Sequence, residues 1–147
     1  MLDISPTPLT IVGAGPAGIA AAHTAAEAGV NVTVIDDNPL PGGQYYRQSP
    51  SEFTISAVAA HSGHAEAAAL YDKLSHPKIR TIHNMQAWGV FDRRLALADR
   101  DRSYLLSIDR IVLATGAYDR SLAFPGWTLP GVFGVGATLR MIKPTST

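Results

Sequence analysis

The sequence has 147 residues and a mass of 15.6 kDa, which is enough for one compact domain. Its 12 basic and 12 acidic residues balance, so charge gives no reason to expect nucleic acid or an anionic membrane as a partner. The chain contains no cysteine, which excludes disulfides, iron–sulfur ligation, thiolate zinc sites and thiol nucleophiles.

We expect a soluble, cytoplasmic protein. A secretory signal needs positive charge near its start, whereas the first basic residue of this chain is Arg47. No uncharged apolar run approaches the length of about 20 residues that a membrane span requires. The hydrophobic share of 46% is typical of a globular chain and too high for a disordered one.

A strand, a helix and a second strand are predicted at the start of the chain. The apolar run 9–12 stops at Gly13, as a short buried strand would. The Ala-rich stretch that follows favours a helix, with Pro16 in its first turn and Gly29 as its C-terminal cap. The β-branched residues 31–36 then predict a second strand, which completes a βαβ unit.

A loop and a second helix are predicted next. Residues 37–55 hold several prolines, two adjacent glycines and few aliphatic side chains, which is typical of a loop. Residues 56–75 favour a helix that Gly63 can interrupt and that Pro77 ends.

Several short segments of β character lie between residues 79 and 114, separated by charged turns. The segments AWGVF, LALA and YLLSI predict an antiparallel meander, and residues 110–114 predict a return to the parallel sheet. Residues 116–134 are rich in glycine and proline and predict an ordered loop, before a short helix over 135–143.

The turn between the first strand and the first helix fits the dinucleotide-binding fingerprint GxGxxG. Gly13 permits a tight turn, Gly15 lets a diphosphate approach the backbone, and Gly18 lets the helix lie close to the sheet. The phosphates would then face the helix N-terminus at Pro16 and Ala17, where unpaired N–H groups and the helix dipole attract anions.

An acidic residue, Asp36, ends the second predicted strand, where dinucleotide-binding domains place a carboxylate. That carboxylate can accept both ribose hydroxyls and would repel a 2′-phosphate, which argues against NADP. The alternative is that the glycines only form a turn. The strand, the helix and the acid together favour dinucleotide binding. We interpret the adjacent Asp37 as a solvated loop acid.

Beyond the fingerprint, the chain resembles a known family at residues 11–18, 41–47 and 113–131. It is similar to the N-terminal part of two-dinucleotide-binding flavoproteins. More closely, it resembles the flavin-bearing subunits of opine oxidase, hydrogen cyanide synthase and bacterial proline or hydroxyproline dehydrogenases. The resemblance covers nearly the whole chain.

The resemblance implies FAD as the cofactor and adds site residues. In that family, a glycine pair after the second strand and an ATG at a strand end approach FAD, and the backbone of the meander binds adenine. The residues that this carries over are Gly42, Gly43, Gln44, Arg47, Ala87, Ala114, Thr115 and Gly116. Arg47 would either pair with a phosphate or brace its loop, and Trp127 would plug the sheet as a buried side chain.

The fold that the resemblance implies is α/β: a three-layer FAD/NAD(P)-binding Rossmann-like domain. It has a central parallel sheet with helices on one face and a β-meander on the other. Residues 1–147 would form a single FAD-binding domain, truncated before a second nucleotide-binding domain. We therefore expect either a fragment or a short chain that needs a partner subunit or the missing domain.

The activity that the resemblance implies is flavin-dependent oxidation of an amine or amino-acid substrate, such as an opine, glycine or proline. The sequence identifies no catalytic acid or base. Two alternatives stay open: an NAD-binding Rossmann dehydrogenase, and a non-catalytic fragment or assembly module. His61 and His64 form an HxxH pair without a third ligand, so we expect a solvated helix face and no metal.

Overall fold

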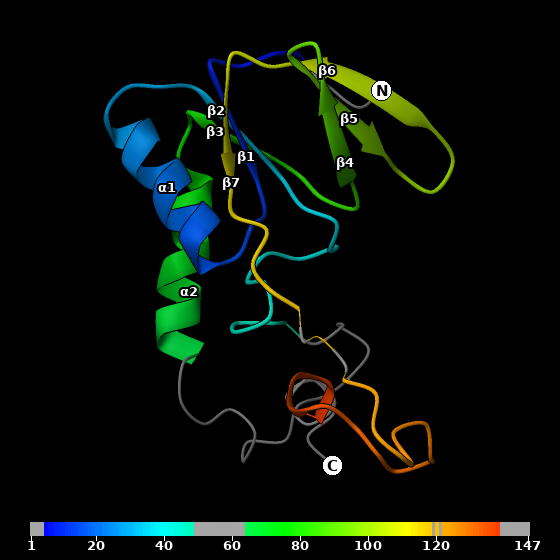
Figure 1. Ribbon diagram of the computed structural model, residues 1–147. Helices are drawn as coiled ribbons and strands as arrows, with labels where there is room; N and C mark the ends of the chain where they lie inside the picture. The colour runs from blue at the N-terminus through cyan, green and yellow to red at the C-terminus, as the bar shows by residue number, and fades with distance from the viewer. Residues whose placement is uncertain (1–4, 49–63, 119, 121, 139–147) are drawn as a thin grey trace.

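The computed structural model describes residues 5–48, 64–118, 120 and 122–138 and contains two β-sheets, two longer α-helices and shorter helical turns (Figure 1). The first sheet is parallel, with strand order β3-β2-β1-β7. Its strands are β1 (Leu9–Val12), β2 (Val32–Ile35), β3 (Ile79–Ile82) and β7 (Arg110–Leu113). The second sheet is antiparallel and consists of β4 (Gln86–Phe91), β5 (Arg94–Ala98) and β6 (Ser103–Ser107).

The helices cover one face of the parallel sheet. They are α1 (Pro16–Glu27) and α2 (His64–Asp72), and a 3₁₀ turn, η1 (Lys73–Ser75), continues α2. The core under α1 contains Ile11, Val32 and Val34 of the sheet together with Ala14 and Ala22. Small alanines on the inner face of α1 let the helix lie close to the strands.

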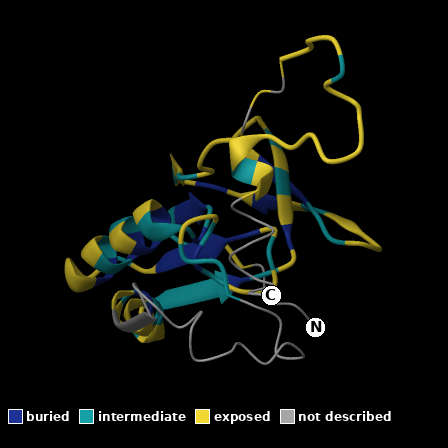
Figure 2. Ribbon diagram, turned by 90° about the horizontal axis from the view of Figure 1, so that it is seen from below, coloured by how far each residue is buried: buried dark blue, intermediate teal, exposed yellow. Residues whose placement is uncertain are grey.

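The antiparallel sheet covers the other face. Because side chains alternate along a strand, Val12 faces away from its neighbour Ile11 and joins Ile35 and Ile82 in a second core cluster. Leu95, Leu97 and Leu106 of the meander also belong to this cluster. Burial is concentrated where these layers meet (Figure 2). The predicted three-layer α/β fold is confirmed.

Several local predictions are also confirmed. Pro16 begins α1, and Gly29 follows its end with a positive φ of 88°. The β4–β5 hairpin turns at Asp92 and Arg93, both of which have positive φ, as a two-residue turn of the primed type requires. The backbone N–H of Asp101, the Tyr104 hydroxyl and the N–H of Arg102 lower the pKa of Asp99 in the second predicted turn.

Residues 79–82 have the predicted β character and form a parallel edge strand, β3, beside β2, outside the meander. Two predicted helices extend beyond the residues that the structure describes. The second helix begins at His64 in the described part, and its predicted start with His61 and Gly63 lies outside it. Residues 135–138 are helical, and the remaining residues of that predicted helix, to 143, are not described. Among the described residues, no helix is long and apolar enough to cross a membrane.

Candidate functional site

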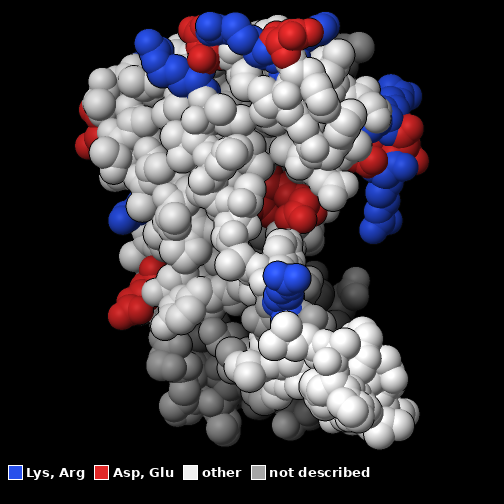
Figure 3. All heavy atoms as spheres, in the orientation of Figure 1, with Lys and Arg blue, Asp and Glu red and all other residues white. Residues whose placement is uncertain are grey.

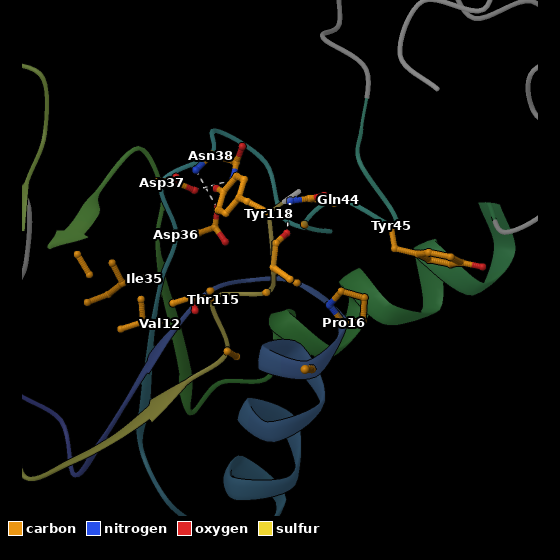
Figure 4. A pocket seen from close by; sticks show the side chains of 18 of the residues that line it. Val12, Pro16, Ile35, Asp36, Asp37, Asn38, Gln44, Tyr45, Thr115 and Tyr118 are labelled. Atoms are coloured by element: carbon orange, nitrogen blue, oxygen red, sulfur yellow. Dashed lines mark hydrogen bonds between the residues drawn. The ribbon is translucent and has the colours of Figure 1, made fainter. Parts of the chain in front are cut away.

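A cavity of about 640 Å³ lies where β1, β2 and β7 end at one edge of the parallel sheet. The chain runs from β1 outward to β2 and β3, and then returns to the opposite side of β1 as β7. Strand order thus reverses at β1, and in open parallel sheets ligands bind at such a point, beyond the carboxyl ends of the strands. The cavity lies there, bordered by the start of α1 (Figure 4).

Gly13 and Gly18 shape the turn from β1 into α1. Gly13 has a φ of 107°, and a Cβ there would collide with the carbonyl of Ala114, which follows β7. A Cβ on Gly18 would collide with the carbonyl oxygen of Gly13. These two glycines are therefore required for packing: Gly13 between β1 and β7, and Gly18 between α1 and its own turn.

Gly15 and Gly43 have a different environment, because they present bare backbone to the cavity. A Cβ on Gly15 would meet only the Cα of Gly43, at 3.8 Å, which is an ordinary contact. A Cβ on Gly43 would lie 3.0 Å from the Cα of Gly15. Both residues line the cavity. The close approach of the two backbone segments therefore depends mainly on the missing side chain of Gly43.

The N-terminus of α1 opens into the same space. Gly15 is its N-cap residue, and the described residues provide neither a side-chain cap nor an acidic group in its first turn. The first backbone N–H groups of a helix and the positive end of its dipole bind anions. With Gly15 and Gly43 leaving the backbone accessible, this end of the cavity fits a diphosphate.

Asp36 follows β2 and points toward the cavity, although the residue is only 7% exposed (Figure 4). Its Oδ2 accepts a hydrogen bond from the Ala14 N–H. Its Oδ1 accepts two more, from the backbone N–H of Asn38 at 2.8 Å and from the Asn38 side-chain amide at 2.9 Å. Three N–H donors thus fix the carboxylate, as a buried charge requires. A carboxylate has about four acceptor positions, so capacity for a ligand hydroxyl remains.

A loop over residues 41–48 forms the wall opposite β1. The Gln44 amide donates to the carbonyl of Ala117 at 2.8 Å and ties this loop to the segment after β7. Arg47 donates to Oδ1 of Asn38 at 2.7 Å. The loop therefore links the ends of β2 and β7 across the cavity.

Helix α2 holds the same loop from outside. Tyr71 donates its hydroxyl to the carbonyl of Tyr46, at 2.5 Å, and Tyr46 donates to Glu66 at 3.2 Å. Partial burial, together with the hydrogen bond and the negative charge of Glu66, raises the pKa of Tyr46 above its ordinary value. Burial and the nearby Tyr46 do the same for the pKa of Tyr71. Both hydroxyls therefore stay neutral donors at physiological pH.

Most of the predicted site residues meet at this cavity. Those that line it are Gly13, Gly15, Pro16, Ala17, Asp36, Gly43, Gln44, Arg47, Ala87, Ala114, Thr115 and Gly116. Their placement in one cavity is a structural fact, and their contact with a cofactor stays a prediction.

Gly18 and Gly42 are exceptions, because the structure places them outside the cavity lining. Gly18 lies beneath the carbonyl of Gly13. Gly42 is buried and donates its N–H to the Ala14 carbonyl at 2.8 Å, and a Cβ there would collide with the carbonyl of Tyr46. Both glycines shape the walls through packing, and their contact with the cofactor stays a prediction.

Trp127 is a clear correction. The sequence predicted a buried plug against the sheet, but this side chain is 46% exposed and belongs to neither core cluster. The described residues after 116 leave β7 and run away from both sheets (Figure 1). The prediction was wrong because the segment that carries Trp127 does not pack on the layers.

Sequence reasoning overlooked other lining residues, among them Asn38, which makes several hydrogen bonds. Asp37 was interpreted as a solvated acid; it is exposed, yet it lines the cavity and accepts a hydrogen bond from Asn38 at 2.6 Å. Met85, Gln86 and Tyr118 also line the cavity. The signal for Asn38 was its position directly after the two acids, since asparagine commonly bonds neighbouring backbone and side chains in turns.

Acidic atoms lie in a hollow near the centre of one face of the molecule, whereas many other charged groups lie near its edges (Figure 3). The charged residues that line the cavity are Asp36, Asp37 and Arg47. No group of three or more metal-ligating side chains occurs in the part of the chain that the structure describes. The lining thus combines bare backbone, two carboxylates and one guanidinium.

The profile of the pyridine nucleotide-disulphide oxidoreductase family matches residues 7–143. The chain is 38% identical over 148 residues to an opine oxidase subunit of Agrobacterium tumefaciens, covering 92% of this chain and 29% of that protein. It is 33% identical over 141 residues to hydrogen cyanide synthase subunit HcnB of Pseudomonas aeruginosa, covering 90% of this chain and 29% of that protein. The chain thus spans less than a third of these relatives.

A solved structure with the same fold is a mutant of the HOCl-induced flavoprotein disulfide reductase RclA from Escherichia coli, in complex with Cu(II). The two superpose with a TM-score of 0.70 at 20% sequence identity, over 92% of this chain and 34% of the other. At this identity the likeness concerns the fold alone.

Proposed function

The chain belongs to the pyridine nucleotide-disulphide oxidoreductase family and has FAD as its cofactor, and we propose that the cavity at the ends of β1, β2 and β7 holds the ADP half of FAD. The observation that carries this proposal is the contact between Gly15 and Gly43. Two glycines leave bare backbone at a helix N-terminus, next to a carboxylate, Asp36, whose orientation is fixed.

The residues present fit each part of this group. Gly15, Gly43 and the first turn of α1 would hold the diphosphate, because a helix N-terminus without side chains in the way attracts and admits an anion. Asp36 would accept ribose hydroxyls. The adenine would lie toward the apolar Met85 and Ala87, which line the cavity from the start of the meander.

When bound, the flavin supplies the two-electron acceptor for an oxidation. The chain's own residues bind and orient the cofactor, and the buried Asp36 disfavours a 2′-phosphate through charge repulsion. We propose an amine or amino-acid type of substrate, such as an opine, glycine or proline. The names of the related proteins, opine oxidase and hydrogen cyanide synthase, support this class.

We further propose that residues 1–147 constitute a single FAD-binding domain that works with additional polypeptide, either a partner subunit or a further domain. Both of these relatives are subunits by name. The segment after β7 also exposes many large apolar side chains, which in soluble proteins mark surfaces for association. They are Tyr118, Leu122, Phe124, Trp127, Leu129, Val132, Phe133 and Val135.

The test is to incubate the purified chain with FAD, to remove free cofactor by gel filtration, and to record the visible spectrum. We expect the protein fraction to absorb at about 450 nm, with FAD and protein present in a roughly stoichiometric ratio. Stabilisation by NADH without flavin retention would favour an NAD-binding dehydrogenase. Loss of all nucleotide during filtration, with association of the chain, would favour an assembly module.

An Asp36→Ala variant is expected to bind ADP more weakly by about 1–3 kcal/mol, the scale of hydrogen bonds to a charged group. The variant also leaves the Ala14 N–H without its carboxylate acceptor, so thermal stability is expected to fall. Isothermal titration calorimetry with ADP measures the first effect. Asp101→Ala is the matched control, because it removes the same charge from an exposed residue outside the cavity lining. Equal losses in both variants would contradict a specific role for Asp36.

A further inference from the structure

Asn38 connects the charged groups of the cavity. Its backbone N–H and its Nδ2 amide both donate to Oδ1 of Asp36, at 2.8 and 2.9 Å, and the same amide donates to Asp37 at 2.6 Å. One side chain thus binds two adjacent carboxylates that would otherwise repel each other. The labelled side chains and the dashed bonds in Figure 4 show this arrangement.

Arg47 fixes the other end of the Asn38 amide. Its guanidinium donates to Oδ1 of Asn38 at 2.7 Å. The amide oxygen therefore faces the cation and the amide nitrogen faces the carboxylates, so the orientation of the amide follows from its partners. A hydrogen bond from a cation polarises the amide and strengthens the bond that the amide donates to Asp36.

The backbone of Asn38 is held from a third direction. Its carbonyl accepts a hydrogen bond from the Asn84 N–H at 3.3 Å and contacts Nδ1 of His83 at 3.2 Å. Both partners follow β3, and the Met85 N–H donates to the Asp36 carbonyl at 3.0 Å. The position of Asn38 is thus set by β2, by the segment after β3 and by the loop that carries Arg47.

We propose that Asn38 is the positioning residue of the ribose end of this site, and that Arg47 acts through Asn38 on the Asp36 carboxylate. This inference rests on the proposed function, because it assumes that Asp36 accepts the ribose hydroxyls. It gives Arg47 a role different from phosphate binding. The carboxylate is held in one orientation, so its remaining acceptor positions face a ribose without reorganisation.

The experiment compares ADP with 2′,3′-dideoxy-ADP, which keeps the base and the diphosphate but lacks both ribose hydroxyls. Calorimetry gives a ratio of affinities for each variant of the full chain. For the unaltered chain we expect a preference for ADP of about tenfold or more, the scale of hydrogen bonds to a charged group. Asn38→Ala is expected to reduce this preference to about threefold or less, mainly through weaker ADP binding.

The Arg47 variants test whether Arg47 acts on the Asp36 carboxylate through Asn38, and they leave Asn38 itself unchanged. Arg47→Met should reduce the preference as Asn38→Ala does, and the double variant should lose little more, because both act on one interaction. Arg47→Lys, which can still donate to the Asn38 oxygen, should restore most of the preference. Gln48→Ala is the matched control: its amide binds the Pro41 carbonyl in the same loop at 3.0 Å, and we expect an unchanged preference.

The outcomes separate the two proposals. An unaltered chain that binds neither nucleotide contradicts the proposed site. An unaltered chain that binds both equally contradicts the ribose contact of Asp36, on which this inference rests. An unaltered chain that prefers ADP, with the preference intact in Asn38→Ala, overturns the positioning role alone. If Arg47→Met weakens both nucleotides equally and lowers the salt dependence of binding, Arg47 binds the diphosphate and the proposed route is wrong. Thermal unfolding of each variant reports on folding, and a loss of stability without a change in preference also counts against the proposal.

Discussion

A Gly15→Val variant is expected to lose ADP and FAD binding while it keeps its fold. Gly15 is extended, with φ −76° and ψ 178°, which a β-branched residue adopts readily. Its Cβ would meet only the Cα of Gly43, at 3.8 Å, so the larger side chain extends into the cavity where the diphosphate would lie. We expect at least about a 100-fold loss of ADP affinity, equivalent to about 2.7 kcal/mol.

Calorimetry with ADP and retention of flavin in gel filtration measure this loss, and circular dichroism checks the fold. Ala20→Val is the matched control, because it adds the same type of side chain to the exposed surface of α1, outside the cavity lining. We expect normal binding in that control. Unchanged nucleotide binding in Gly15→Val would place the nucleotide elsewhere on the protein and would contradict the proposed function.

A Gly18→Ala variant is expected to lose much of its stability, whereas Gly15→Val is expected to keep its fold. A single Cβ on Gly18 collides with the carbonyl oxygen of Gly13 and comes within 3.3 Å of the Ala114 side chain. The colliding atom is backbone, so α1 must move away from the turn. Such overpacking costs about 1–3 kcal/mol or more, a large fraction of the stability of a domain of this size.

Urea or thermal unfolding compares the stability of Gly18→Ala with that of Gly15→Ala. Gly15→Ala is the control, since its Cβ makes only an ordinary contact, and we expect it to lose less than about 1 kcal/mol. Equal stability of Gly18→Ala and Gly15→Ala would mean that α1 does not pack on its turn as the structure shows.

The sequence predicted the elements of the fold because their signals are local. The apolar run of β1, the glycine spacing of the turn, the Ala-rich composition of α1 and the charged hairpin turns each act within a few residues. The position of Asp36 follows from the same pattern, because an acid at the end of β2 must lie near the turn after β1 when the two strands are adjacent and parallel. The sheet order was consistent with the predicted βαβ unit and the returning strand.

Other site predictions depended on contacts that the pattern does not encode. Gly42 was grouped with Gly43, but the hydroxyl of Tyr71 on α2 and the carbonyl of Tyr46 occupy the space beside it. Trp127 was assigned to the core from its size alone, and its segment leaves the sheets. In both cases the outcome depends on where a distant segment lies in space, which spacing along the chain does not show.

The sequence by itself thus determined the class of fold, the turn that offers bare backbone and the acid beside it, because periodicity, glycine conformation and strand ends are properties of short segments. Only the tertiary structure decided which glycines face the cavity and which are closed by packing. It also revealed that Arg47 reaches Asp36 through Asn38. The physical reason is that hydrogen bonds and steric contacts act over a few ångströms, so they depend on which distant segments folding brings together.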